Sequence, residues 1–215
     1  MMRPHPDQTL PTMPSTIVRR PLSDSEAAEL QARTPPSWEQ LRFRAGEEGF
    51  DACDGPLLLD GALEIEENVL VVLGDLECDI LFVNDIASLI VAGRLRARAI
   101  IGNGGIYVLG DLDCQTLVGL SYGDRMFGCA GHARVGALLE DAHTFAFVGG
   151  FEADLVAPVS NVLSLPADAR IARDFSDGMT PQQAREAFVE AVLEDDALDI
   201  DSVCGELWEG RSPLR

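Results

Sequence analysis

The chain has 215 residues, of which 47% are hydrophobic and 24% charged, so its composition is that of a folded globular protein and excludes wholesale disorder. Its formal net charge is -20, from 36 acidic and 16 basic side chains, and every basic side chain is an arginine. Such a charge repels nucleic acids and anionic membranes and favours encounter with a cationic partner.

We expect no secretory signal at the beginning of the chain. Residues 1–22 contain several prolines without apolar periodicity, which predicts a flexible arm, and they lack the continuous apolar stretch of a signal peptide. No run in the chain approaches the roughly 18 apolar residues of a membrane span. The five cysteines are scattered and form no CxxC pair, so neither a disulfide framework nor a zinc ribbon is indicated. We therefore expect a cytoplasmic protein.

Residues 23–55 are expected to form a helical N-terminal cap. The segment SDSEAAELQAR has Ser23 at a position typical of a helix N-cap and acidic residues in its first turn, and Pro35 ends it. The following apolar residues Trp38, Leu41 and Phe43 are expected to cover the end of the next element.

Residues 56–158 contain a repeated phrase. Its copies, written from a glycine, are GDLECDIL (74–81), GRLRARAI (93–100), GDLDCQTL (110–117), GHARVGAL (131–138) and GGFEADLV (149–156). The glycines lie 19, 17, 21 and 18 residues apart. A period near 19 suits one coil of a β-solenoid better than a hairpin meander or a helical repeat.

Matched positions of the repeat keep the same residue class, which gives the strands a predicted inside and outside. The second, fourth and seventh positions after each glycine are apolar in the first four copies, whereas the third carries Glu77, Arg96, Asp113 and Arg134. Because side chains alternate across a strand, the apolar positions should stack inside the solenoid and the charged ones should point out. An antiparallel sandwich is the alternative, but it would require hairpin turn signals that are scarce here.

Residues 159–215 are expected to form a connector followed by acidic C-terminal helices. The segment 160–179 has no repeat, and we interpret it as the connector. Thr180 followed by Pro181 is typical of a helix start, and Asp199 or Asp201 is expected to cap a second short helix. We expect these helices to close the open end of the solenoid, because a bare terminal strand invites polymerisation.

No set of residues in the sequence predicts catalysis. A metal site built from His132 and His143 with Asp141 or Cys129 would need a third histidine, and the remaining one is His5 in the arm. No Ser-His-Asp order, HExxH or GxSxG pattern is present. We therefore predict a non-enzymatic protein with no catalytic residue, no cofactor and no metal.

The outward charges on the repeat define a predicted binding surface. Arg94, Arg96 and Arg98 on one coil face acidic residues on both neighbouring coils, so we expect cross-strand ion pairs. The acidic side chains are expected to form a negative surface that contacts a protein partner. These candidate partner-binding residues are Glu64, Glu66, Glu67, Glu77, Asp79, Asp111 and Asp113.

The segment running from VLVVLGDLECDIL to LGDLDCQTLVG, with SYGD (121–124) and DAHTF (141–145), resembles bacterial bactofilin-like proteins, the polymer-forming cytoskeletal group. It is most similar to relatives found at polymorphic-toxin loci, as is the ending GELWEGRSPLR (205–215). The resemblance implies a right-handed parallel β-helix of about 5–6 coils without catalytic residues. Helical flanks distinguish this chain from the bare solenoid of bactofilins.

Two functions follow as hypotheses. The first is an immunity protein that neutralises a basic toxin domain through its acidic surface. The alternative is a bactofilin-like structural protein that assembles with copies of itself.

Overall fold

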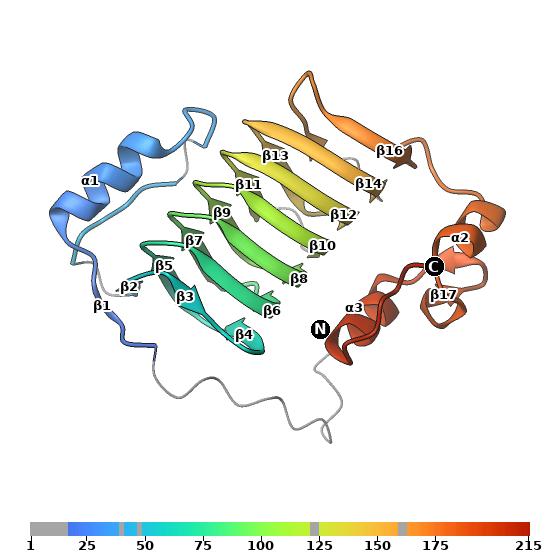
Figure 1. The fold of residues 1–215 in the computed structure, drawn as a ribbon, viewed down its shortest axis with the longest axis horizontal. Coiled ribbons are helices and arrows are strands. Elements are labelled where there is room, and N and C mark those ends of the chain that lie inside the picture. The colour runs from blue at the N-terminus through green and yellow to red at the C-terminus, as the bar shows by residue number, and fades with distance from the viewer. Residues whose placement is uncertain (1–16, 39–40, 47–48, 121–124, 159–162) are drawn as a thin grey trace.

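A computed structural model describes residues 17–38, 41–46, 49–120, 125–158 and 163–215, and its centre is a parallel β-solenoid of about 6 turns (Figure 1). About 48% of the residues are in strands and 16% in helices. The predicted fold class, a mainly β parallel solenoid with helical flanking segments, is confirmed.

Two sheets run along the solenoid, and each coil contributes one strand to each sheet. The short-strand sheet has the order β1 (Arg20–Pro21), β2 (Phe50–Cys53), β5 (Asn68–Val72), β7 (Ala87–Val91), β9 (Gly105–Val108), β11 (Met126–Cys129), β13 (Thr144–Phe147) and β15 (Leu163–Ser164). The long-strand sheet consists of β3 (Leu57–Leu58), β4 (Ala62–Ile65), β6 (Leu76–Val83), β8 (Leu95–Gly102), β10 (Leu112–Leu120), β12 (His132–Asp141), β14 (Gly150–Pro158) and β16 (Arg170–Asp174). All neighbouring strands are parallel except β1, which runs antiparallel to β2.

The repeated phrases stack in register, as the sequence predicts. Leu112 pairs with Leu95 on one side and with Ala133 on the other, and Leu95 pairs with Leu76. All four side chains are buried and belong to one core inside the coils. Each fully buried leucine contributes about 1.5–3 kcal/mol through removal of its surface from water. The columns of stacked aliphatic side chains are therefore the main source of stability.

The glycine of each phrase lies at a corner where two coils come close together. A Cβ atom on Gly110 would lie 2.4 Å from the carbonyl oxygen of Gly93, and one on Gly131 would lie 2.5 Å from the carbonyl oxygen of Gly110. Neither glycine has a positive φ. Close backbone approach, rather than a left-handed conformation, thus explains the glycine at this position.

A bend divides each long strand into two halves. In β10 the side chains of Cys114 and Leu117 belong to the inner core, whereas Gln115 and Thr116 between them both lie outside it. Two successive outward residues interrupt the alternation that a straight strand would show. The register reflects this bend, because pairing between β10 and β12 passes from Cys114–Val135 directly to Thr116–Ala137. The outer face therefore has two differently oriented halves.

The N-terminal segment covers the outer face of the short-strand sheet. Helix α1 (Asp24–Arg33) starts at a capping box in which Ser23 and Glu26 satisfy each other's backbone amides, so the predicted N-cap is confirmed. Trp38 and Leu41 pack in one cluster with outward residues of the sheet, including Ile90 and Tyr107. In Figure 1, α1 lies beside the coils rather than across their end. Trp38 and Leu41 were expected to cover the end of the solenoid, but they cover its side.

The solenoid continues into the segment expected to be a connector. β15 pairs in parallel with β13, and β16 pairs in parallel with β14. Ala169 and Ile171 extend the inner apolar columns by one more coil. The connector prediction for these residues is wrong, and the physical reason is that apolar and polar residues still alternate there although the corner glycine is missing.

The remaining residues form a C-terminal lobe. It contains α2 (Pro181–Ala187), a 3₁₀ turn (Glu190–Val192), the hairpin of β17 (Leu193–Glu194) and β18 (Ala197–Leu198), and α3 (Ile200–Trp208). Thr180 caps α2 and Asp199 caps α3, as predicted.

This lobe packs on the second, apolar half of the long-strand sheet's outer face. Phe188 and Val203 of the lobe share one buried cluster with Ile101 and Leu139 of the sheet. The lobe therefore covers a side of the solenoid, and the expectation that its helices close the open end is wrong. An apolar outer half-face needs such a cover because it would otherwise expose a continuous hydrophobic strip to water.

The inner columns provide a direct test of the register. Leu95→Asp places a carboxylate where exposure is 0%, and we expect the cooperative unfolding transition to be lost. Arg96→Asp changes an adjacent outward side chain that is 50% exposed, and we expect a folded protein with a loss of about 1 kcal/mol. Circular dichroism during thermal melting measures both, and equal tolerance of the two variants would contradict the register.

Candidate functional site

The outer face of the long-strand sheet carries a column of charges that alternate in sign from coil to coil. Its six members, paired strand by strand, are Glu77, Arg96, Asp113, Arg134, Glu152 and Arg170. We call this set the charge ladder. Neighbouring strands lie about 4.8 Å apart, so like charges at these positions would repel and opposite charges attract. Alternation along the ladder therefore removes repulsion between coils.

Ion pairs join the rungs of the ladder. The guanidinium of Arg96 lies 4.0 Å from a carboxylate oxygen of Glu77 and 3.6 Å from one of Asp113. The carboxylate of Glu152 lies 3.7 Å from the guanidinium of Arg134 and 3.5 Å from that of Arg170. The expected cross-strand pairing of the arginines is confirmed. Because these side chains remain largely accessible to water, each pair is worth at most about 1 kcal/mol.

Arg98 connects the sheet to the C-terminal lobe. Its guanidinium donates to both carboxylate oxygens of Asp79, at 2.8 and 3.1 Å, and to the main-chain oxygen of Leu207 at 3.1 Å. Its side chain is 22% exposed, less than the other arginines of this coil. Arg98 thus connects β8 to the end of α3 through hydrogen bonds.

The predicted acidic surface is divided into two parts. Four of the seven candidate residues lie next to arginines: Glu77 and Asp113 beside Arg96, Asp79 beside Arg98 and Asp111 beside Arg94. The other three, Glu64, Glu66 and Glu67, lie on and after β4, and no arginine of the described residues pairs with their side chains. Of the seven predicted residues, those without a neighbouring arginine therefore all lie on the first coil.

Glu64 borders the C-terminal lobe. It pairs in register with Phe82, whose ring lies 5.9 Å from the ring of Trp208 on α3. Partial burial, and then the nearby charge of Glu66, raises the pKa of Glu64 above its ordinary value. Its carboxylate consequently binds a proton more tightly than that of an isolated surface glutamate. A cation placed beside it would stabilise its charged form.

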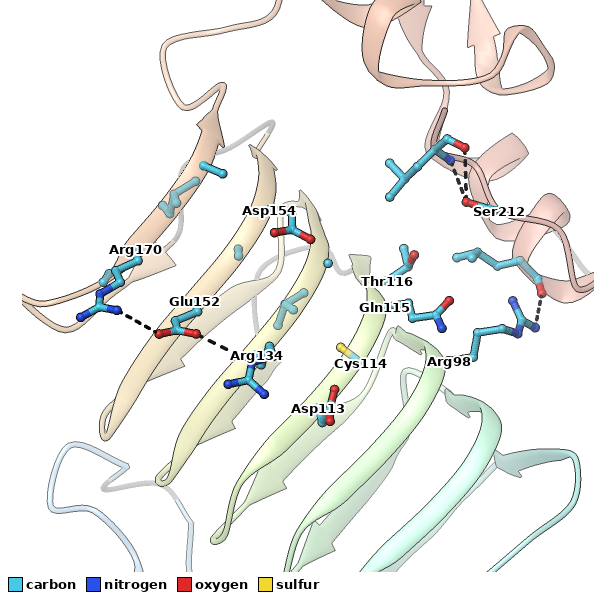
Figure 2. A pocket seen from close by; sticks show the side chains of 18 of the residues that line it. Arg98, Asp113, Cys114, Gln115, Thr116, Arg134, Glu152, Asp154, Arg170 and Ser212 are labelled. Carbon is cyan, nitrogen blue, oxygen red and sulfur yellow. Dashed lines mark hydrogen bonds and ion pairs between the residues drawn. The ribbon is translucent and has the colours of Figure 1, made fainter.

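A groove of about 1070 Å³ lies between the bends of the long strands and the end of the C-terminal lobe. Gln115, Gly136 and Asp154 line it from successive strands, and residues 207–214 line the opposite side (Figure 2). Sequence reasoning missed this groove because its two walls are separated by more than 30 residues of sequence. The only signal was the pair of successive polar residues Gln115 and Thr116 within an otherwise alternating strand.

The histidines considered for a metal site are far apart. His132 begins β12 at the surface, whereas His143 follows the end of that strand and is completely buried. A strand of this length spans about 30 Å. Among the described residues, no group of three or more His, Cys, Asp and Glu side chains is placed to hold a metal ion. His5 lies outside the described residues.

The five cysteines are free thiols, and four of them are buried. Burial, and then the nearby charges of Asp79 and Glu77, raise the pKa of Cys78 to about 12. Burial likewise raises the pKa of Cys129 to about 12. Since the thiolate is the nucleophile, these side chains are inert packing residues at neutral pH, as the sequence predicts for Cys78 and Cys114.

Comparisons with known proteins provide no family for this chain: no family model, no characterised protein and no solved structure matches it. The resemblance to bactofilin-like proteins thus stays a prediction. Among the described residues, no helix combines the length and the apolarity that crossing a membrane requires.

His143 is a buried titratable group inside the last coils. Neither of its ring nitrogens has a hydrogen-bond partner among the residues that the structure describes, and its ring lies 5.3 Å from that of Phe145. Its main-chain amide donates to the buried carboxylate of Glu140 at 3.1 Å. Loss of contact with water lowers the pKa of His143 to about 4, because the charged imidazolium is poorly solvated there.

This pKa predicts a loss of stability in acid. The folded-state pKa lies below the ordinary value of 6.5, so the unfolded chain binds the proton more tightly, and stability falls as the pH drops from about 6.5 towards 4. The loss should reach about 3 kcal/mol. Urea unfolding at pH 7.5 and 4.5 measures it. In His143→Leu the difference between the two pH values should shrink, and an unchanged difference would contradict the assignment to His143.

Proposed function

We propose that this protein is a non-enzymatic, cytoplasmic β-solenoid that binds a basic protein partner, and that it acts as an immunity protein for a bacterial toxin domain. The observation that carries the proposal is the uneven placement of its charge. The middle of the long-strand sheet pairs its acidic residues with arginines, whereas the first coil and the C-terminal lobe keep an excess of acid.

The C-terminal lobe contributes most of this excess. Residues 175–215 include ten acidic and three basic side chains, and one of the latter, Arg211, pairs with Glu206. Arg185 pairs with Asp196 at 2.8 Å at the tip of the β17–β18 hairpin. The lobe meets the first coil beside Glu64, whose partner in register, Phe82, contacts Trp208. A cationic surface brought to this region gains long-range attraction, which accelerates association and weakens in salt.

The cytoplasmic part of the proposal draws on the five free cysteines. Disulfides persist in oxidising compartments, whereas four buried, unpaired thiols suit a reducing one. The resemblance to proteins of polymorphic-toxin loci adds the toxin as the class of partner.

The test uses the protein encoded by the neighbouring open reading frame, expressed with and without this chain. We expect the chain to restore growth to cells that express the toxin domain, and isothermal titration to show an affinity that falls at least tenfold between 50 and 300 mM salt. The triple variant Glu64→Gln, Glu66→Gln, Glu67→Gln should bind at least tenfold more weakly.

A matched control changes three acidic residues on the opposite side of the fold. Asp24→Asn, Glu29→Gln and Asp51→Asn remove the same total charge from the N-terminal segment and its neighbouring strand. This variant should keep most of the affinity. Equal weakening of both triple variants, or no growth rescue by the unaltered chain, would overturn the proposal.

Self-assembly is a second candidate, favoured by β16, whose outer edge pairs with no other strand of the described residues. This strand is the last of the long-strand sheet, and four of its five side chains are exposed. At the other end, β1 covers only the edge of the short-strand sheet, leaving β3 and β4 at the edge of the other. Strand edges of this kind pair with further chains. Filaments seen by electron microscopy of the purified protein would favour this candidate, and one discrete small species by light scattering would exclude it.

A further inference from the structure

The bends of the long strands form a second column beside the charge ladder. It consists of the residue five positions after the glycine of each phrase: Asp79, Arg98, Gln115, Gly136, Asp154 and, in the last coil, the equivalent Ala172. These residues lie beside residues 207–214, and five of the six line the groove together with residues of that segment.

One end of this column shows how the fold accommodates a guanidinium. Arg98 lies one coil after Asp79 and donates two hydrogen bonds to its carboxylate, and a third bond reaches the main-chain oxygen of Leu207. The cation is thus held between an acidic bend residue and the main chain of the C-terminal lobe. Both acceptors use the planar fork of the guanidinium.

The other end of the column repeats the acid without the cation. Asp154 occupies the same place in its coil as Asp79, but its neighbours in the column are Gly136 before it and Ala172 after it. Within the described residues, the carboxylate of Asp154 makes neither a hydrogen bond nor an ion pair. Figure 2 shows it projecting from β14 into the groove, on the wall opposite Ser212.

We propose that this groove binds an arginine side chain of the partner protein, with Asp154 as the carboxylate that receives its guanidinium. The proposal deepens the proposed function and rests on it for the existence of a basic partner. Gly136 contributes no side chain to the part of the groove beside Asp154, and a Cβ atom there would lie 2.4 Å from the carbonyl oxygen of Gln115. The side chain of Gln115 and the hydroxyl group of Thr116 line the groove next to this space and provide further acceptors (Figure 2).

The arginines near the groove do not make it an anion site. Arg134 and Arg170 both face Glu152, and Arg98 is held by Asp79 and Leu207. Arg134 and Arg170 belong to the charge ladder and share the carboxylate of Glu152, whereas in the column of the bends an anion would meet the carboxylate of Asp154. Charge complementarity therefore selects a cation, and the pairing of Arg98 with Asp79 favours a guanidinium over an ammonium.

The first experiment uses a capped Gly-Arg-Gly peptide and the matched peptide with citrulline, which has the same shape without the charge. Amide chemical shifts of the full chain, followed by NMR during titration, should move around Gln115, Gly136 and Asp154 with the arginine peptide alone. Asp154→Asn should weaken this binding about tenfold or more. Asp85→Asn, which removes one charge from an exposed turn elsewhere, should leave it unchanged.

A second variant fills the site from within the chain. Ala172 is exposed and follows Asp154 by one coil, as Arg98 follows Asp79, so Ala172→Arg should place a guanidinium on Asp154 and abolish peptide binding in a folded protein. Thermal melting checks the fold. Equal binding of the arginine and citrulline peptides, or full binding by Asp154→Asn or Ala172→Arg, would overturn the proposal.

The outcomes separate this inference from the proposed function. A toxin domain that binds the unaltered chain and Asp154→Asn equally well would contradict the arginine site and keep the immunity function. An arginine peptide that binds as described, together with a neighbouring gene product that does not bind, would contradict the immunity function and keep the site.

Discussion

The stacking of each coil on the next at a strand spacing of about 4.8 Å is the constraint on which the rest of this structure depends. It places every side chain beside the equivalent side chain of two neighbouring coils. Aliphatic residues such as Leu95 and Leu112 gain from this proximity, since they form continuous buried columns. A corner residue with a Cβ atom would collide with the preceding coil, which explains Gly110 and Gly131. Charges tolerate the spacing only when their signs alternate or when a neutral residue separates them.

The outer faces of the solenoid differ in whether another part of the chain covers them. One outer face is covered by the N-terminal segment through Trp38, and half of another is covered by the C-terminal lobe through Phe188. What remains exposed is the charged half of the long-strand sheet, with the groove along its boundary. The covered faces fix the position of the lobe, because Arg98 and the apolar cluster both hold it against the sheet. The groove therefore has two walls that are set by packing rather than by the groove's own contacts.

The sequence predicts the coils well because the repeat preserves residue class at fixed offsets from a glycine. The apolar positions two, four and seven after the glycine also indicate the bend, because in a straight strand the third apolar residue would come at position six. Two features were missed for physical reasons. The last coil lacks the corner glycine, so Arg170–Asp174 was interpreted as a connector although Ile171 keeps the alternation. The lateral position of the lobe was missed as well, although Ile101, Val118 and Leu139, which are apolar at outward positions, indicate a covered face. The groove depends on contacts between distant segments, and local patterns carry little information about those.

The alternating ladder from Glu77 to Arg170 also restricts how this solenoid can change in length. Its pattern repeats every two coils, about 38 residues, rather than every coil. Deleting or duplicating a single internal coil would bring two arginines or two carboxylates into neighbouring rungs, whereas gaining or losing coils in pairs would restore the order. The charge pattern of the solenoid thus has a repeat unit of two coils, although its backbone has a repeat unit of one.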